Sequence, residues 1–173
     1  MNIWLGLSKR IDAFSRWSGI VFSYLIIPLT LLIVFEVVTR SFKRPTIWTF
    51  EMSNFLYGAH FMLVAAYGLL YRSHVAIDLI SGRFSKKVQA VFSLICYLLM
   101  YFPFIIVFIY FGYSYSINSW QMLEKSWSIW GPPLYPIKTV IPITAAMLFL
   151  QGISEVIKAV NVLVQEGRGT HES

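Results

Sequence analysis

The chain has 173 residues, of which 57% are hydrophobic and 13% are charged, whereas typical soluble domains carry about 25% charged residues. A small soluble domain exposes most of its surface and needs polar side chains there, so this composition excludes an ordinary water-soluble enzyme. The net charge of +6 would suggest a nucleic-acid partner in a soluble protein, but membrane proteins commonly carry such an excess in their cytoplasmic loops. We therefore expect a protein embedded in membrane lipid, with no nucleic-acid partner.

Four long runs of the chain carry no charged residue: 17–35, 52–71, 88–123 and 139–154. A bilayer core about 30 Å thick needs about 20 apolar residues as a helix, and no alternating pattern of membrane strands recurs. The sequence predicts an all-α integral membrane protein with four transmembrane helices in one domain of residues 1–165. The predicted spans are about 17–38, 52–71, 88–115 and 139–160, and the polar tail 166–173 is expected to be disordered.

The third run is longer than one membrane crossing, and residues 113–120 mix Tyr, Ser, Asn and Trp. We expect one long helix that leaves the bilayer through the interface, where Tyr and Trp accumulate. Pro103 predicts a kink in this helix. Cys96 is the only cysteine, and we interpret it as a small buried apolar residue.

The N-terminal segment has two interpretations that stay open. One face of a helix there would carry Ile3, Leu7, Ile11 and Phe14, which is typical of an amphipathic helix lying in the membrane interface. The alternative is a simple extension of the first span into the cytoplasm. A cleaved signal peptide is not expected, because the 19 apolar residues of the first run exceed the usual core of about 7–15.

The charges of the loops predict the orientation. Nine Lys and Arg residues lie in the N-terminal segment, the loop after the second span and the C-terminal segment, against five on the opposite side. Positively charged loops remain cytoplasmic, so both termini are expected in the cytoplasm.

Ionisable residues at membrane depth need a partner, which makes several of them candidates for contacts between helices or subunits. Glu36 and Arg40 have the i,i+4 spacing of an ion pair, either within the chain or to another subunit. Trp48 and Glu51 precede the second span, and a carboxylate near a helix start complements the free N–H groups. His60 is expected to donate a hydrogen bond between helices.

His74 and Asp78 form a second pair at i,i+4, in the loop after the second span. Asp78 can hold His74 in one tautomer or stabilise its charged form, and such a pair can relay protons. The favoured interpretation is that the pair fastens the inner loop to neighbouring helices. Gly82 is expected to end this turn, and Ser85 to cap the next helix.

The connection between the third and fourth spans, residues 124–136, contains three prolines and a glycine, which interrupt the helix. Glu124 opens this connection. Trp127, Trp130 and Tyr135 are expected at the outer interface, either as an aromatic belt or as a docking surface for a protein outside the membrane.

Several catalytic motifs are absent from the sequence. It contains no GxxxxGK[ST] loop, no HExxH motif and no cysteine cluster, so neither ATP hydrolysis nor zinc chemistry is expected, and no cofactor is predicted. Four helices without broken segments or repeats do not make a complete secondary transporter.

Together these features resemble the small membrane subunit (DctQ type) of a TRAP transporter, the tripartite ATP-independent periplasmic system. The resemblance covers roughly residues 10–160 and rests on Glu36 with Arg40, Trp48, Glu51, Gly68, His74-Val75 with Asp78, Glu124 with Ser126, and Pro142 to Leu150-Gln151-Gly152. It implies a scaffold in the bacterial inner membrane beside a large membrane subunit, which carries the substrate and sodium sites and moves as an elevator. It also implies a soluble periplasmic protein that delivers an organic carboxylate or sulfonate. The chain itself is not expected to be an enzyme.

The alternative is a haem- or quinone-binding membrane anchor of a redox complex, which four helices and intramembrane histidines suggest. His60 and His74 are 14 residues apart, about 21 Å along a helix. Both cannot ligate one haem within a monomer, so this alternative is disfavoured.

Overall fold

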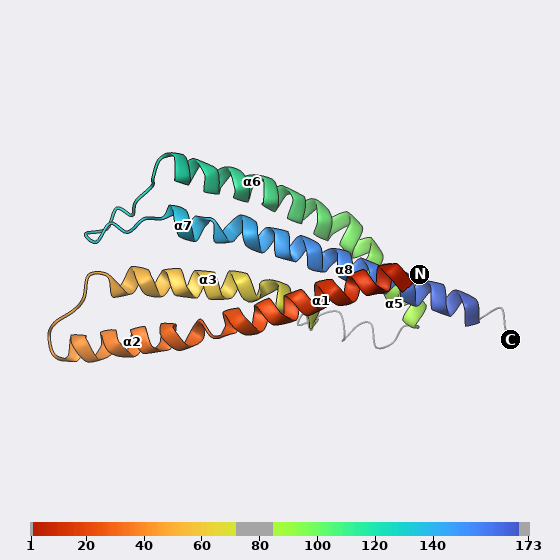
Figure 1. Ribbon diagram of the computed structural model, residues 1–173, viewed down its shortest axis with the longest axis horizontal. Helices are drawn as coiled ribbons and strands as arrows, with labels where there is room; N and C mark the ends of the chain where they lie inside the picture. The colour runs from red at the N-terminus through yellow and green to blue at the C-terminus, as the bar shows by residue number, and fades with distance from the viewer. Residues whose placement is uncertain (1, 72–84, 170–173) are drawn as a thin grey trace.

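The computed structural model describes residues 2–71 and 85–169, and these ranges contain helices and loops but no strand. The chain runs along the molecule in alternating directions (Figure 1). In chain order the helices are α1 (Asn2–Ser23), α2 (Ile26–Ser41), α3 (Thr49–Leu70), α5 (Lys86–Cys96), α6 (Phe102–Gln121), α7 (Tyr135–Lys138) and α8 (Val140–Gly169). The loops after α2 and α6 lie at one end, which we call the loop end. Both termini lie at the other, the terminal end.

Three stretches are long and apolar enough to cross a membrane: Ile3–Ser41, Lys87–Gln121 and Tyr135–Gln165. The predicted all-α membrane class is confirmed to this extent. α3, with 22 residues, is not among them, and it carries Glu51, Asn54 and His60. The crossing by α3 and the cytoplasmic position of the termini therefore stay predictions. α8 continues to Gly169, so the helix includes the start of the segment expected to be a disordered tail.

A break at Tyr24 and Leu25 divides the predicted first span. The amides of these residues bond to carbonyls three positions back, at 3.3 Å for Tyr24 and 3.1 Å for Leu25. Pro28 explains the break, because proline has no N–H and its ring crowds the carbonyl four residues earlier. This proline lies in the middle of the apolar run 17–35, and the break was not among the features predicted from the sequence.

α1 packs against α3 and α8 with a face that the amphipathic pattern did not indicate. Its buried residues are Ser8, Ser15, Ser18 and Gly19, whereas Ile3, Leu7 and Phe14 are exposed. Small polar residues allow helices to approach closely in a membrane protein, where lipid covers the apolar side chains as well as a neighbouring helix does. The apolar face of α1 therefore points outward, away from α3 and α8.

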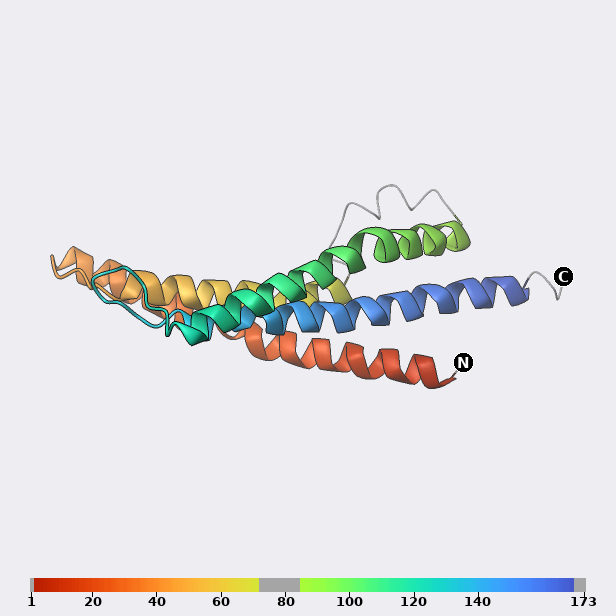
Figure 2. The same ribbon diagram turned by 90° about the horizontal axis from the view of Figure 1, so that it is seen from above.

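The long third helix bends at a π-helical turn, η1 (Tyr97–Tyr101), just before Pro103 (Figure 2). The predicted kink is thus present. Pro103 cannot donate a backbone hydrogen bond, and a widened turn on its N-terminal side accommodates the ring. The hydroxyl of Tyr101 donates to the carbonyl of Leu148 at 2.8 Å, which ties the bend to α8. The prediction for Cys96 was wrong: this residue is exposed, because the outside of a membrane bundle is as apolar as its core.

Gly19 allows α1 to approach Tyr67 of α3 closely. A Cβ atom at Gly19 would lie 2.3 Å from the Cβ of Tyr67, whereas one at Gly58 would meet nothing within 4 Å. Gly19→Ala is therefore expected to lower the free energy of unfolding by about 1–3 kcal/mol through overpacking. The matched Gly58→Ala change is expected to be neutral or to stabilise by up to about 1 kcal/mol, because alanine favours the helix. Unfolding in detergent measures both, and equal stabilities would contradict the close contact.

Candidate docking and assembly sites

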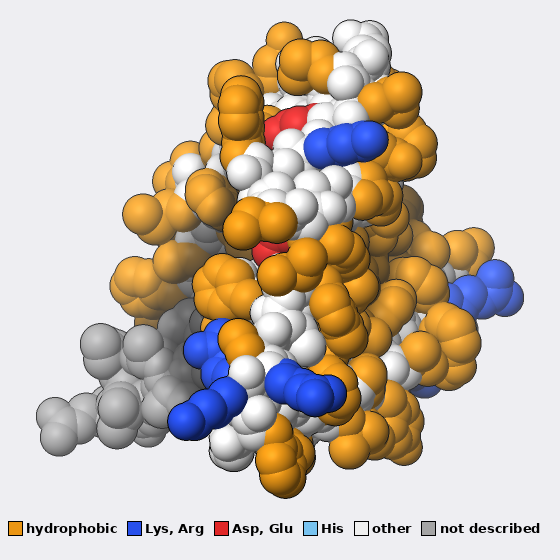
Figure 3. Space-filling view, turned by 90° about the vertical axis from the view of Figure 1, so that its left-hand side faces the viewer, with side chains coloured by type: hydrophobic (Ala, Val, Ile, Leu, Met, Phe, Trp, Pro, Cys, Tyr) orange, Lys and Arg blue, Asp and Glu red, His pale blue; other side chains and the backbone are white. Residues whose placement is uncertain are grey.

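At the loop end, Glu36 joins α2 to the loop that follows it. Arg40 Nε lies 2.7 Å from Glu36 Oε1, and the hydroxyl of Thr46 donates to Glu36 Oε2 at 2.5 Å. The ion pair that the spacing predicts is therefore present within the chain. Figure 3 shows this end of the molecule, where acidic and basic side chains lie among a largely hydrophobic surface.

Glu51 fastens the α6–α7 loop to the start of α3. Its carboxylate accepts hydrogen bonds from the hydroxyls of Ser126 and Ser128, the latter at 2.8 Å. Trp48, one residue before α3, packs between Phe35 of α2 and Trp130 of the loop, with ring centroids 6.2 and 6.4 Å away. Sequence reasoning placed Glu51 at the helix start but did not connect it with the loop, 75 residues away.

Glu124 closes the base of the same loop. Its carboxylate pairs with Lys138 of α7 at 2.5 Å, and its backbone carbonyl accepts from the amide of Leu134 at 2.9 Å. The Lys138 ammonium lowers the pKa of Glu124 below its ordinary value. Both ends of the loop are thus held at one place.

This pKa shift predicts how the loop responds to pH. When the pKa of a carboxyl group is lower in the folded than in the unfolded protein, its ionised form stabilises the folded state at pH values above the pKa of the unfolded state. This stabilisation is lost as the pH falls through the pKa of the folded state. We expect the Leu134 amide to be protected from hydrogen exchange at neutral pH and to lose protection only in acid below the usual glutamate pKa. Glu124→Gln should abolish this acid dependence, and an unaltered profile would contradict the assignment.

The structure separates the three aromatic residues predicted to form a docking surface. Trp130 packs on Trp48, and Tyr135 packs on Trp120 with centroids 4.4 Å apart. Trp127, at the tip of the loop, is fully exposed, with a relative accessibility of 102%, and Ile129 beside it is 91% exposed. The loop therefore presents two apolar side chains at its tip, and Trp127 is the one residue of the predicted three that is fully exposed, while Trp130 and Tyr135 are partly buried.

The predicted pair of His74 and Asp78 lies outside the described residues, whereas His60 is described. His60 Nδ1 is 3.1 Å from the carbonyl oxygen of Phe22. Because a carbonyl only accepts, Nδ1 carries the proton, and the predicted bond between helices is confirmed.

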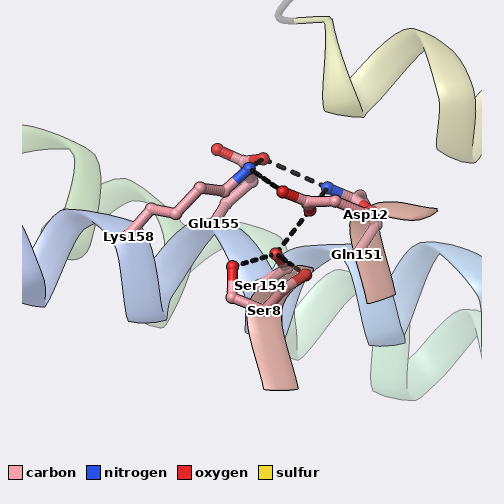
Figure 4. A network of polar contacts seen from close by, with 6 residues as sticks. All are labelled: Ser8, Asp12, Gln151, Ser154, Glu155 and Lys158. Atoms are coloured by element: carbon pink, nitrogen blue, oxygen red, sulfur yellow. Dashed lines mark hydrogen bonds and ion pairs between the residues drawn. The ribbon is translucent and has the colours of Figure 1, made fainter. Parts of the chain in front are cut away.

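The terminal end holds a polar network between α1 and α8 that sequence reasoning missed. Figure 4 shows Ser8 and Asp12 of α1 facing four side chains of α8, namely Gln151, Ser154, Glu155 and Lys158. Ser8, Gln151, Ser154 and Glu155 are all at least 98% buried. Among the described residues, no group of three or more His, Cys, Asp and Glu side chains is placed to hold a metal ion.

Asp12 is the centre of this network. Its carboxylate accepts from Ser154 at 2.6 Å and from Gln151 at 3.0 Å, and Lys158 Nζ lies 3.3 Å away. Lys158 also pairs with Glu155. Since Ser154 gives its one proton to Asp12, Ser8 is the donor in the 2.7 Å bond between the two serines. The carboxylates, hydroxyls and ammonium of the network bond to one another, which indicates a structural role, while the side-chain oxygen of Gln151 is buried without a hydrogen-bond partner among the described residues. The sequence does contain a pattern that could have predicted this network. Glu155 follows Gln151 by four residues and Lys158 follows Glu155 by three, so the three side chains share one helix face.

Comparison with known proteins gives one family. The chain matches the family described as tripartite ATP-independent periplasmic transporters, DctQ component, over residues 29–162. The match includes the loop-end residues and most of α8, while Ser8 and Asp12 precede it. No curated protein matches the chain significantly.

Proposed function

Since the chain belongs to the DctQ component family of the tripartite ATP-independent periplasmic transporters, we propose that it is the fixed scaffold subunit of an ion-gradient-driven importer. The large membrane subunit would carry the substrate and ion sites, with sodium as the proposed coupling ion. A periplasmic protein would deliver an organic carboxylate or sulfonate. The observation that carries this proposal is the family match over most of the chain.

The polar groups of the described residues support a scaffold role. Glu36, Glu51, Glu124 and Asp12 all make hydrogen bonds or ion pairs within the chain, so these acidic side chains are occupied in holding helices and loops. The outer surface is apolar along α2 and α6. Such a surface can be covered by lipid or by a larger membrane subunit.

The Glu36, Trp48 and Glu51 contacts suggest how the loop end serves assembly. We propose that they hold the α2–α3 and α6–α7 loops in one arrangement, so that the exposed Trp127 and Ile129 are presented to the periplasmic protein. His74 and Asp78 remain proposed assembly residues on the basis of the family resemblance alone. The proposed orientation places the loop end in the periplasm and both termini in the cytoplasm.

Co-purification tests this function. The tagged chain, expressed together with the large membrane subunit of its transporter, is expected to retain that subunit in detergent. Liposomes that contain both subunits should take up substrate only with the periplasmic protein and an ion gradient, and the isolated chain should transport nothing. Transport by the isolated chain, or failure to retain the large subunit, would contradict the proposal.

A further inference from the structure

A groove of about 470 Å³ runs between α1 and the end of α3 at the terminal end. Its α1 wall contains Lys9, Asp12 and Arg16, which recur at the three- and four-residue spacings of one helix face, and Trp17 beside Arg16. Ile20 continues this wall, and Leu70 and Tyr71 form the opposite side. The groove is therefore built by two segments that are about 50 residues apart in the chain.

The groove has an excess of positive charge. Lys9 and Arg16 are exposed, and neither makes an ion pair within residues 2–71 and 85–169. The acidic residue between them, Asp12, is already engaged by Lys158, Ser154 and Gln151. The two cations are seven residues apart, about 10 Å along the helix, so their long side chains can converge on one anion.

The lining of the groove changes from charged to aromatic to apolar along α1, which matches the order of head group, interface and acyl chain in a phospholipid. Along α1 the two cations Lys9 and Arg16 come first, Trp17 stands next to Arg16, and the apolar Ile20 lies four residues beyond Arg16, further from the terminal end. Trp17 is 66% exposed and Tyr71 is 51% exposed, and both residue types favour the level of the lipid head groups. A soluble anion would use the cations but would leave the apolar end of the groove empty.

We propose that this groove binds an anionic phospholipid, with its phosphate between Lys9 and Arg16 and an acyl chain along Ile20 and Leu70. Arg and Lys both donate to phosphate oxygens, and each such cation near a membrane surface strengthens the binding of anionic lipid. The lipid would fill the space between α1 and α3 beside the Asp12 network and so brace the terminal end. This inference needs only that the chain lies in a membrane, and it is independent of the proposed transport function.

Native mass spectrometry of the purified full chain tests the proposal. Phosphatidylglycerol is titrated against phosphatidylcholine with the same acyl chains, and the wild type is expected to bind phosphatidylglycerol more tightly. The double variant Lys9→Gln/Arg16→Gln is expected to lose that affinity by about 10- to 30-fold. The control Lys43→Gln/Arg44→Gln removes the same charge from exposed residues at the loop end and should bind as the wild type does.

Each alternative outcome would overturn the proposal. Equal losses in the two double variants would mean diffuse electrostatic attraction, and equal binding of the two lipids would mean no site for the phosphate. Full competition by inorganic phosphate would mean that the groove takes a soluble anion. Because all four substituted residues are exposed, the variants should unfold in detergent at the wild-type temperature, which separates lost binding from lost folding.

Discussion

Lys158→Met is expected to lower the free energy of unfolding by up to about 3 kcal/mol, the lower end of the cost of removing one partner of a buried ion pair, because the Lys158 and Asp12 side chains are 30% and 26% exposed. Lys158 contacts Asp12 at 3.3 Å and also pairs with Glu155, which is only 2% exposed. Methionine preserves the apolar stem but removes the ammonium from between two carboxylates. Chemical unfolding in detergent, followed by circular dichroism, measures the effect.

The controls for Lys158 distinguish the loss of this pair from the loss of a positive charge in general. Lys125→Met removes an exposed lysine that makes no ion pair with the described residues and is expected to change stability by less than about 0.5 kcal/mol. Adding Asp12→Asn to Lys158→Met should recover part of the loss, because one of the facing charges is then neutral. Equal stability of the two lysine variants would show that the network does not support the fold.

Replacing Trp127 and Ile129 together by alanine is expected to weaken binding of the periplasmic protein by at least about 30-fold, the usual effect of removing a tryptophan anchor from an interface. Both side chains are almost fully exposed and touch little of their own chain, so the fold should be unchanged. Binding of the periplasmic protein to the membrane complex and the uptake rate in liposomes measure the effect.

Trp130→Ala is the matched control for this docking prediction. Trp130 packs on Trp48, so its removal should loosen the α6–α7 loop and lower stability by up to about 1.5 kcal/mol beyond the area it buries. If the Trp127/Ile129 double variant unfolds, or if it binds the periplasmic protein as tightly as the wild type does, the result would falsify docking through Trp127. The same measurement on Tyr135→Ala should show a stability loss, since Tyr135 packs on Trp120.

Local spacing predicted the contacts that lie within one helix or at its start. Glu36 and Arg40 pair as their i,i+4 spacing indicates, and Ser85 caps α5 by accepting from the amide of Val88. Pro103 predicted the bend of the third helix, although the π-helical turn before this proline was not predicted. These contacts depend on helix geometry alone, so the residues concerned are neighbours in the sequence.

Burial was predicted less well, because the usual rule that apolar residues lie inside fails when the solvent is lipid. Ser8, Ser15 and Ser18 are buried on α1, while Ile3 and Phe14 are exposed. A serine-rich face carries a weak hydrophobic signal, and close helix packing in membranes selects small side chains for reasons of size. The same reason explains why Cys96 lies on the outside.

By itself, the sequence determined that this protein is helical and embedded in lipid, since the length and apolarity of a run are local properties. The family followed from residues spread over the chain. Only the tertiary structure decided which polar side chains meet: Asp12 and Lys158 are separated by 146 residues, and Glu51 and Ser126 by 75. It also decided that Trp127 is free while Trp130 and Tyr135 are packed. Such pairings depend on how the helices cross and where the loops fold back, and no spacing along the chain encodes them.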